Sequence, residues 1–343
     1  MSEAPPFWFQ KPGIAAWALS PIGAIYGAIT AKRMQKTDGV VTKTPVLCIG
    51  NFITGGAGKT PTAIAIAKIA RELGLRPGFL SRGYGGSITK PTIVDIKAHN
   101  AKDVGDEPLI LGLYAVTVIS PNRPAGAALL EEQGIDIILM DDGFQNPSLH
   151  KDYSLAVVDA SRGIGNGFCM PAGPMRAPLR PQLALASAIL LIGKSEAGTR
   201  VVRKAAKMAK PILEAEIIAR RADDWTGQRV LAYAGIADPS KFYASLEAVG
   251  AEVVERRNFH DHHPYSAEEC HDLLTRAKSE KLTLVTTEKD SVRLIRMGEG
   301  QQELRTASKV LNVDLKFENP KMVEVIIRDT IKRAAEFRIS KKN

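Results

Sequence analysis

From residue 44 onward, short apolar runs alternate with stretches whose apolar residues recur at helical spacing. The runs are continuous, which is typical of strands buried on both faces of a largely parallel sheet covered by helices. We predict strands at 45–50, 78–81, 92–96, 116–120, 136–140, 155–159 and 188–192. We predict helices at 60–73 and 124–133, the first ending before Gly74.

A polar stretch at 221–227 interrupts this pattern, and a second α/β series follows it. Its predicted elements are strands at 229–235, 252–256 and 282–286, helices at 239–249 and 267–278, and a final basic helix at 321–338. We therefore predict two α/β domains with a cleft between them, and ligands in such folds lie beyond the carboxyl ends of the strands. The predicted divisions are an N-terminal segment at 1–43, a core domain at 44–222, a smaller α/β domain at 223–318 and a C-terminal helix at 319–343.

The N-terminal segment contains an uncharged run at residues 12–31, which is long enough to span a bilayer. The run is rich in Ala and Gly and contains Pro21, so we expect low hydropathy and an interrupted helix. A signal peptide fits poorly, since no cluster of positive charge precedes the run. Trp8 and Trp17, with Lys32 and Arg33 nearby, favour a helix that lies in the membrane interface. A helix packed on the protein's own core and a true membrane span are the alternatives.

The composition suits a globular protein, with 343 residues of which 45% are hydrophobic and 24% are charged. The formal net charge of +9 favours acidic partners such as nucleotides or an anionic membrane surface. Aromatic residues make up only 6% and are not interleaved with basic ones, so we expect no nucleic-acid partner. Three scattered cysteines match no metal-ligand spacing and indicate reduced thiols, with Cys48 in the core.

A glycine-rich loop, Gly55-Gly56-Ala57-Gly58-Lys59-Thr60, follows the first predicted strand and leads directly into a helix. Glycines let backbone N–H groups turn toward phosphate oxygens, and the helix N-terminus adds partial positive charge. In such a P-loop, Lys59 bridges the terminal phosphates of ATP and the Thr60 hydroxyl holds Mg²⁺. The usual pattern has glycine at position 53, where this chain has Ile53, and the Gly55-Gly56 pair offers a substitute flexible point. The alternative is a glycine-rich turn that binds nothing.

Asp141 and Asp142 follow a buried strand, where P-loop proteins place the carboxylate that holds Mg²⁺ directly or through water. Adjacent residues of an extended backbone point to opposite sides. One carboxylate can therefore face the metal while the other reaches toward the substrate or a helix. A solvated turn before Gly143 is the alternative.

Two segments offer a base for the attacking group. The first is Gly105-Asp106-Glu107-Pro108, which alternatively is a helix-capping turn. The second is His260-Asp261-His262-His263, for which a zinc site or a solvated loop are the alternatives.

Two other classes of P-loop protein have signatures that this chain lacks. A partitioning ATPase has a signature lysine before the paired glycines, where this chain has Thr54. A GTPase needs an Asn/Thr-Lys-x-Asp motif, and in Thr287-Glu288-Lys289-Asp290 the lysine is adjacent to the aspartate. Both classes are disfavoured, and the residues fit a P-loop NTPase-like kinase best.

Taken together, these motifs resemble those of the tetraacyldisaccharide 4′-kinase family, the kinases of lipid A biosynthesis. The matching segments lie at 50–52, 55–61, 81–86, 104–108, 141–145, 171–176, 259–262 and 286–290. The resemblance implies transfer of the ATP γ-phosphoryl group to the 4′-hydroxyl of a tetraacylated disaccharide 1-phosphate, which gives the 1,4′-bisphosphate. It also implies two α/β domains and a peripheral enzyme on the cytoplasmic face of the bacterial inner membrane, which we expect to be monomeric.

The resemblance assigns roles position by position. The resemblance implies catalytic roles for Asp106, as the base, and for His262 and Lys59. It implies that Mg²⁺ is held by Thr60, Asp141 and Asp142, and that substrate or phosphate is contacted by Arg82, Tyr84 and Arg176. The residues implied to bind ATP are Thr54, Gly55, Gly56, Ala57, Gly58, Lys59, Thr60 and Pro61. The family commonly has Glu after the arginine that corresponds to Arg176, whereas this chain has Ala177.

Overall fold

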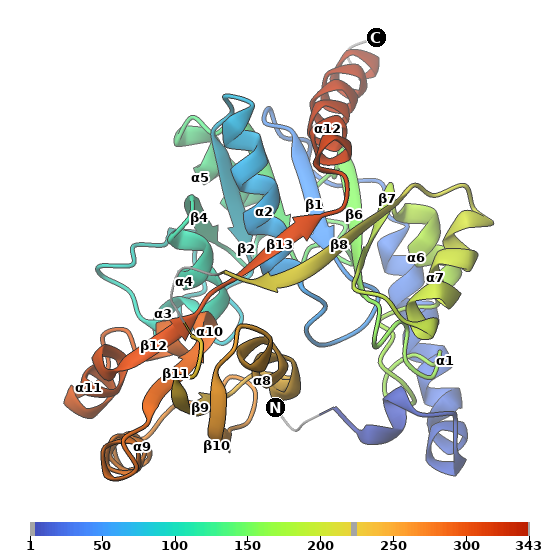
Figure 1. Cartoon of the computed structure of the whole chain (residues 1–343). Coiled ribbons are helices and arrows are strands. Elements are labelled where there is room, and N and C mark those ends of the chain that lie inside the picture. Colours follow the sequence, from blue (N-terminus) through green and yellow to red (C-terminus); the bar gives the residue numbers. More distant parts are fainter. Residues whose placement is uncertain (1–3, 221–224, 342–343) are drawn as a thin grey trace.

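The computed structural model describes residues 4–220 and 225–341, which form two α/β units, each with its own sheet (Figure 1). The larger sheet has nine strands in the order β13-β8-β7-β6-β1-β5-β2-β4-β3. They are β1 (Val46–Gly50), β2 (Pro77–Ser81), β3 (Thr92–Ile93), β4 (Val116–Ile119), β5 (Ile137–Asp141), β6 (Tyr153–Asp159), β7 (Ala188–Ile192), β8 (Ile212–Ala219) and β13 (Val313–Phe317). The smaller sheet has the order β10-β9-β11-β12, formed by β9 (Arg229–Ala234), β10 (Glu252–Asn258), β11 (Thr283–Thr287) and β12 (Ser308–Leu311).

Helices cover both faces of the larger sheet and flank the smaller one. Those before the smaller sheet are η1 (Pro6–Phe9), α1 (Ile14–Met34), α2 (Lys59–Glu72), α3 (Ala101–Val104), α4 (Asp106–Gly112), α5 (Arg123–Glu132), α6 (Leu179–Leu185) and α7 (Glu196–Ala206). The rest are α8 (Pro239–Ala248), α9 (Ala267–Ser279), α10 (Glu288–Arg293), α11 (Glu299–Ala307) and α12 (Pro320–Ser340).

The predicted parallel sheet is confirmed. From β8 to β4 every neighbouring pair of strands runs parallel, and only the edge strands β13 and β3 pair antiparallel. Alternate side chains of β1 enter different cores, with Leu47 and Ile49 packing on the α2 and α12 side and Val46 and Cys48 on the α5 to α7 side. Each fully buried side chain of this size contributes about 1.5–3 kcal/mol, so burial on both faces accounts for the continuous apolar runs.

The strand order decides where the predicted motifs meet. β1 lies between β5 and β6, and Ile49 of β1 pairs in register with Asp141 of β5. Since the three strands are parallel, the loop after β1 and the carboxylates after β5 lie at the same edge of the sheet.

The chain returns to the larger sheet after the smaller one. The sequence placed residues 313–317 in the second domain, but the structure pairs them as β13 with β8. Leu315 and Phe317 pack into the core shared with α2, which explains why this strand joins the larger sheet. The predicted boundary between residues 222 and 223 lies outside the described residues.

The interrupted helix expected near Pro21 is wrong, because α1 is one helix from Ile14 to Met34. A proline has no N–H to donate to the carbonyl four residues earlier, which here belongs to Trp17. The Ser20 hydroxyl donates to that carbonyl at 2.8 Å. The side chain thus supplies the hydrogen bond that the proline removes.

The two sides of α1 differ in their surroundings. Its buried residues are small apart from the last, Ala16, Gly23, Gly27, Ala31 and Met34. A Cβ on Gly23 would lie 2.6 Å from the carbonyl oxygen of Cys169, so the glycine permits close packing on that segment. Large apolar side chains remain exposed along the helix, namely Ile14, Trp17, Ile22, Ile25 and Ile29. By length and composition α1 could cross a membrane, although such a helix is weak evidence by itself.

Candidate active site

The glycines of the predicted phosphate-binding loop adopt conformations that other residues avoid. Gly55 has a φ of 97° and Gly58 a φ of 83°, in the left-handed region that glycine enters without steric penalty. A Cβ on Gly58 would lie 2.5 Å from Cδ1 of Ile192. Ile53, which stands where the motif usually has glycine, is buried and forms a β-bridge with Met175. The start of the loop is therefore anchored at Ile53, and the first left-handed backbone conformation of the loop lies at Gly55.

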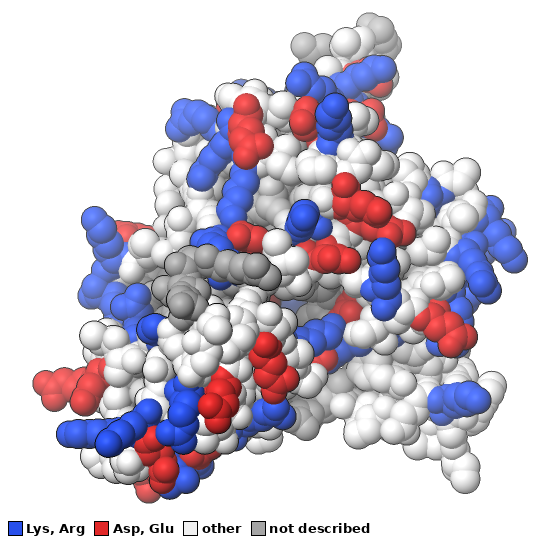
Figure 2. Space-filling model, viewed as in Figure 1, with Lys and Arg blue, Asp and Glu red and all other residues white. Residues whose placement is uncertain are grey.

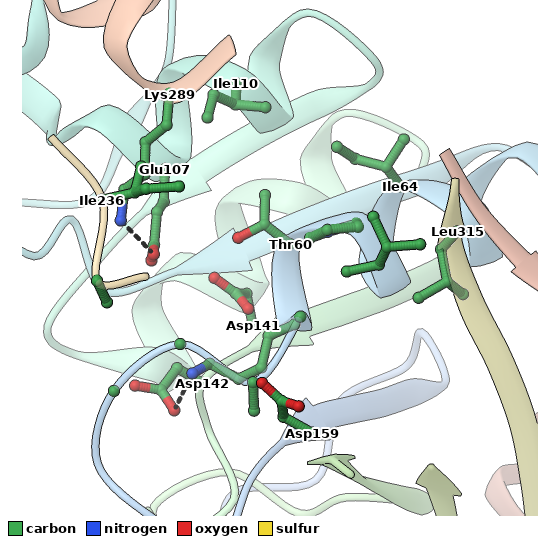
Figure 3. Close-up of a pocket in the computed structure, with 18 of the residues that line it drawn as sticks. Thr60, Ile64, Glu107, Ile110, Asp141, Asp142, Asp159, Ile236, Lys289 and Leu315 are labelled. Atoms are coloured by element: carbon green, nitrogen blue, oxygen red, sulfur yellow. Dashed lines mark hydrogen bonds and ion pairs between the residues drawn. The ribbon is translucent and has the colours of Figure 1, made fainter. Parts of the chain in front are cut away.

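Lys59 and Thr60 occupy the first turn of α2, where free backbone N–H groups and the helix dipole favour anions. Lys59 Nζ lies 3.6 Å from Asp142 Oδ1, and its side chain is only 10% exposed. Figure 3 shows Thr60 and Asp141 lining the same cavity. The first turn of α2 thus offers a cation and a hydroxyl beside the carboxylates of β5.

Asp141 is a buried carboxylate at the end of β5, with an exposed fraction of 1%. Burial, followed by the charge of Glu107, raises the pKa of Asp141 to about 7. Its Oδ1 has no hydrogen-bond partner among the described residues. An unpaired buried carboxylate oxygen is unfavourable unless a ligand satisfies it. Together with the Thr60 hydroxyl, this oxygen fits Mg²⁺, which prefers oxygen ligands.

Asp142 has different partners, and its φ of 49° turns the chain away from the strand. Arg176 donates to both carboxylate oxygens of Asp142, at 2.7 and 3.1 Å. Burial alone would raise the pKa of Asp142, but Lys59 and Arg176 hold it well below its usual value. Asp142 therefore stays ionised and positions Lys59.

Arg176 was expected to meet substrate or phosphate. It lines the cavity, where its guanidinium binds Asp142 and donates to Gln145 Oε1 at 3.1 Å. The next residue, Ala177, is fully buried, and its carbonyl accepts a hydrogen bond from Gln182 Nε2 at 2.6 Å. This position therefore contributes a methyl group to the core rather than a carboxylate to the site.

The two units meet at Asp106, the first residue of α4, which is 5% exposed. His262 Nδ1 lies 2.9 Å from Asp106 Oδ2, and Arg293 Nε donates to the same oxygen at 2.8 Å. Burial alone would raise the pKa of Asp106, but the hydrogen bond from His262 and the charges of Lys289 and Arg293 hold it well below its usual value. Asp106 Oδ1 accepts from the Glu107 N–H at 2.9 Å, but Gly105 is the N-cap of α4 and no side chain caps this helix, so the capping alternative is not supported.

The hydrogen bonds of His262 define its tautomer. Lys289 Nζ lies 3.4 Å from His262 Nε2, and an ammonium can only donate. In a neutral ring, this contact assigns the lone pair to Nε2 and the hydrogen to Nδ1, which donates it to Asp106. His263 faces Glu269 instead, at 2.9 Å, so the histidines of this loop do not converge. No group of three or more His, Cys, Asp or Glu side chains that could hold a metal ion occurs in the described ranges.

Arg82 and Tyr84, the other predicted substrate residues, are exposed and line the cavity. The Tyr84 ring lies 6.0 Å from the His262 ring, edge to face. Both side chains are thus available at the mouth of the site.

Sequence reasoning missed two contributors. Arg293 binds Asp106 across the units, and its Nη1 donates to Asp290 Oδ1 at 2.7 Å. The only local sign of Arg293 in the sequence is that it follows Asp290 by three residues, shortly after a strand. Asp159, at the end of β6, binds Lys241 of α8 at 2.5 Å and faces the cavity (Figure 3). A carboxylate at the tip of the strand next to β1 could have suggested it.

One cavity of about 1550 Å³ draws its lining from both units, including the glycine-rich loop, Asp141, Asp142 and His262, while Asp106 lies buried behind His262. Figure 2 shows the surface hollowed between them, with basic and acidic side chains around the hollow. One wall holds the loop and the carboxylate pair, and the other brings His262 to Asp106. The cavity has room for a nucleotide and an acceptor.

Comparisons with known proteins identify the family of the chain. A model of the tetraacyldisaccharide-1-P 4′-kinase family matches residues 15–332. The chain is 50% identical to a tetraacyldisaccharide 4′-kinase of Agrobacterium fabrum over 96% of its own length and 95% of the relative. It is also 50% identical to one of Rhizobium meliloti, over 93% and 92% of the two chains.

A solved structure shows the same fold. The crystal structure of LpxK from Aquifex aeolicus in complex with ATP aligns with a TM-score of 0.72 and 23% identity, covering 93% of this chain and 100% of that one. Given the family match and the curated relatives, the chain belongs to the tetraacyldisaccharide 4′-kinase family.

Proposed function

We propose that the protein transfers the γ-phosphoryl group of Mg-ATP to the 4′-hydroxyl of a tetraacylated disaccharide 1-phosphate, within lipid A biosynthesis. The observation that carries the proposal is the hydrogen bond between Asp106 and His262, whose ring lines the same cavity as the glycine-rich loop. A kinase needs both a phosphate-binding loop and a group that orients or deprotonates the acceptor. The family membership supports the same reaction.

On the donor side, backbone N–H groups of residues 54–61 and the Lys59 ammonium would hold the phosphates. Thr60 and Asp141 would hold Mg²⁺, with Asp142 keeping Lys59 in place. Bound Mg²⁺ would neutralise the charge that develops on the phosphate oxygens.

On the acceptor side, the Asp106 and His262 pair would receive the proton of the sugar hydroxyl. The low pKa of Asp106 makes its carboxylate a weak proton acceptor by itself. It accepts the Nδ1 hydrogen of His262 and stabilises the imidazolium that forms, so His262 Nε2 would take the proton first. The hydroxyl would take the place of Lys289 beside Nε2. Arg82 and Tyr84 would contact the substrate from the mouth of the cavity.

The acyl chains of such a substrate lie in a membrane, and α1 offers a surface for one. Its small residues pack on the protein while Ile14, Trp17 and Ile25 are exposed. Lys32 and Arg33 at its end suit an anionic surface. A spanning helix would have to leave its packing on Cys169, so we propose that α1 lies in the interface on the cytoplasmic face of the inner membrane. We further propose that the enzyme acts as a monomer.

The test is transfer of label from γ-labelled ATP to the purified disaccharide 1-phosphate in detergent micelles. Wild-type protein should yield a labelled 1,4′-bisphosphate, and omission of either substrate should yield none. ATP hydrolysis without any labelled glycolipid would contradict the proposal.

A further inference from the structure

Lys151 lies outside the residues assigned to the reaction, yet its ammonium is fully engaged close to the site. Nζ donates to the carbonyl oxygens of Gly143, Phe144 and Asn146, at 3.3, 3.1 and 2.7 Å. An ammonium has three hydrogens to donate. All three are thus directed at the backbone of one short loop, and no ion pair with a carboxylate is found for Lys151 in the described parts of the chain.

That loop, residues 143–146, directly follows the two carboxylates of the metal side. The Asp142 N–H donates to the Ile49 carbonyl of β1 at 3.0 Å, and the loop begins with the next residue. Phe144 packs so closely on β1 that a Cβ on Gly50 would lie 2.4 Å from its Cβ. The loop therefore lies between the end of β1, which starts the phosphate-binding loop, and the Lys151 ammonium.

The loop also carries Gln145, which links the two halves of the donor site. Gln145 Nε2 donates to the Asn51 carbonyl at 2.7 Å, and Gln145 Oε1 accepts from Arg176. Arg176 in turn holds both oxygens of Asp142. A shift of the loop would therefore move Asp142 relative to Lys59.

Three carbonyl oxygens that converge on one point repel one another unless a cation lies between them. Lys151 supplies that cation covalently, and burial lowers its pKa. A neutral side chain of the same length would leave the three carbonyls without their shared donor. The loop would then lose the contact that fixes its shape next to Asp142.

We propose that Lys151 is a positioning residue for the magnesium side of the active site, acting through the 143–146 loop on Asp142 and Arg176. The inference rests on the proposed function, since it assumes that Mg²⁺ binds beside Asp141. It makes Lys151 necessary for the affinity of that metal site rather than for the fold.

The experiment measures the Mg²⁺ concentration for half-maximal phosphoryl transfer in full-length variants, together with thermal unfolding. For Lys151→Met we expect this concentration to rise by about 10-fold or more, as for other residues that hold metal ligands in place. Lys151→Arg keeps a multi-donor cation and should remain within about 3-fold of wild type, since a guanidinium can also donate to several carbonyls. Lys210→Met is the matched control, because Lys210 donates to a single carbonyl at the surface, and it should behave as wild type.

An unchanged Mg²⁺ requirement in Lys151→Met would overturn the proposal, whatever happens to its unfolding temperature. If neither Lys151→Met nor Lys151→Gln can be obtained folded while Lys151→Arg can, the ammonium serves the fold, and the proposal is likewise overturned. Asp141→Asn is measured alongside, so that a failure of the Lys151 proposal can be told apart from a failure of the proposed Mg²⁺ site. If Asp141→Asn keeps the wild-type Mg²⁺ dependence, the proposed metal site itself is wrong.

Discussion

At the scale of single residues, Asp141 and Asp142 show how neighbours in one motif acquire opposite properties. Burial and Glu107 raise the pKa of Asp141 to about 7, whereas Lys59 and Arg176 hold that of Asp142 well below its usual value. The difference depends on side chains from three other parts of the chain. The sequence predicted that the pair would divide its roles, but not which residue would do which.

Asp141→Asn should stabilise the protein while removing Mg²⁺-dependent activity. The folded-state pKa of about 7 lies above the unfolded value of about 3.9. The folded chain therefore holds a proton that the unfolded chain releases, so the free energy of unfolding falls as the pH rises from about 4 to about 7. Asparagine resembles the protonated form of aspartate. Above pH 7 the free energy of unfolding of the variant should therefore exceed that of wild type by on the order of 1–3 kcal/mol.

Urea unfolding of both proteins at pH 5 and pH 8 checks this expectation. The advantage of Asp141→Asn should be larger at pH 8. A variant that is less stable than wild type at pH 8 would show that Asp141 is not strained by its burial.

Lys59→Ala should abolish phosphoryl transfer without unfolding the protein. Lys59 is a positively charged side chain at the first turn of α2, and its ion pair with Asp142 is partly open to the cavity. Loss of a phosphate-binding cation should lower the rate by about 100-fold or more. The rate of label transfer and the circular dichroism spectrum are measured together. Normal turnover by Lys59→Ala would contradict the assignment of this loop as the phosphate-binding loop.

At the scale of elements, the long predicted segments are confirmed because their apolar pattern is local. The strands β1, β5 and β7 and the helices α2, α8 and α9 follow the predicted ranges closely. β8 and β13 were missed, since β8 alternates buried and exposed residues at the edge of the cavity and β13 depends on β8 for its pairing. The break expected in α1 at Pro21 does not occur, and the hydrogen bond from the Ser20 hydroxyl to the Trp17 carbonyl could not be predicted from the apolar pattern.

The exposed side of α1 yields a prediction about membranes. Ile25→Ser combined with Ile29→Ser removes two apolar side chains that are 64% and 65% exposed. Binding to vesicles that contain anionic lipid should weaken by about 10-fold or more, because each lost side chain removes roughly 1–2 kcal/mol of burial. The measurement is cosedimentation with the vesicles.

Val325→Ser is the matched control, since Val325 is an equally exposed apolar side chain, at 63%, on α12 rather than on α1. It should bind vesicles as wild type does. Unchanged binding by the double α1 variant would favour the view that α1 serves only to pack on the protein.

At the scale of the whole molecule, the site is formed where two units meet. The glycine-rich loop, the carboxylate pair and Asp106 were found from sequence because each is a short local motif beside a predicted strand or helix. Arg293 was not, because it lies 187 residues from Asp106 and only the docking of the units brings them together. The same holds for Asp159 and Lys241, which are 82 residues apart.

The central claim is that one unit binds the donor while the pair formed across both units activates the acceptor. Asp106→Asn tests it most directly, because asparagine keeps the shape of Asp106 and an oxygen that accepts hydrogen bonds. The dissociation constant for ATP should remain within about 3-fold of wild type, while kcat for glycolipid phosphorylation falls by about 100-fold or more. A kcat equal to that of wild type, or a loss confined to ATP binding, would contradict the account.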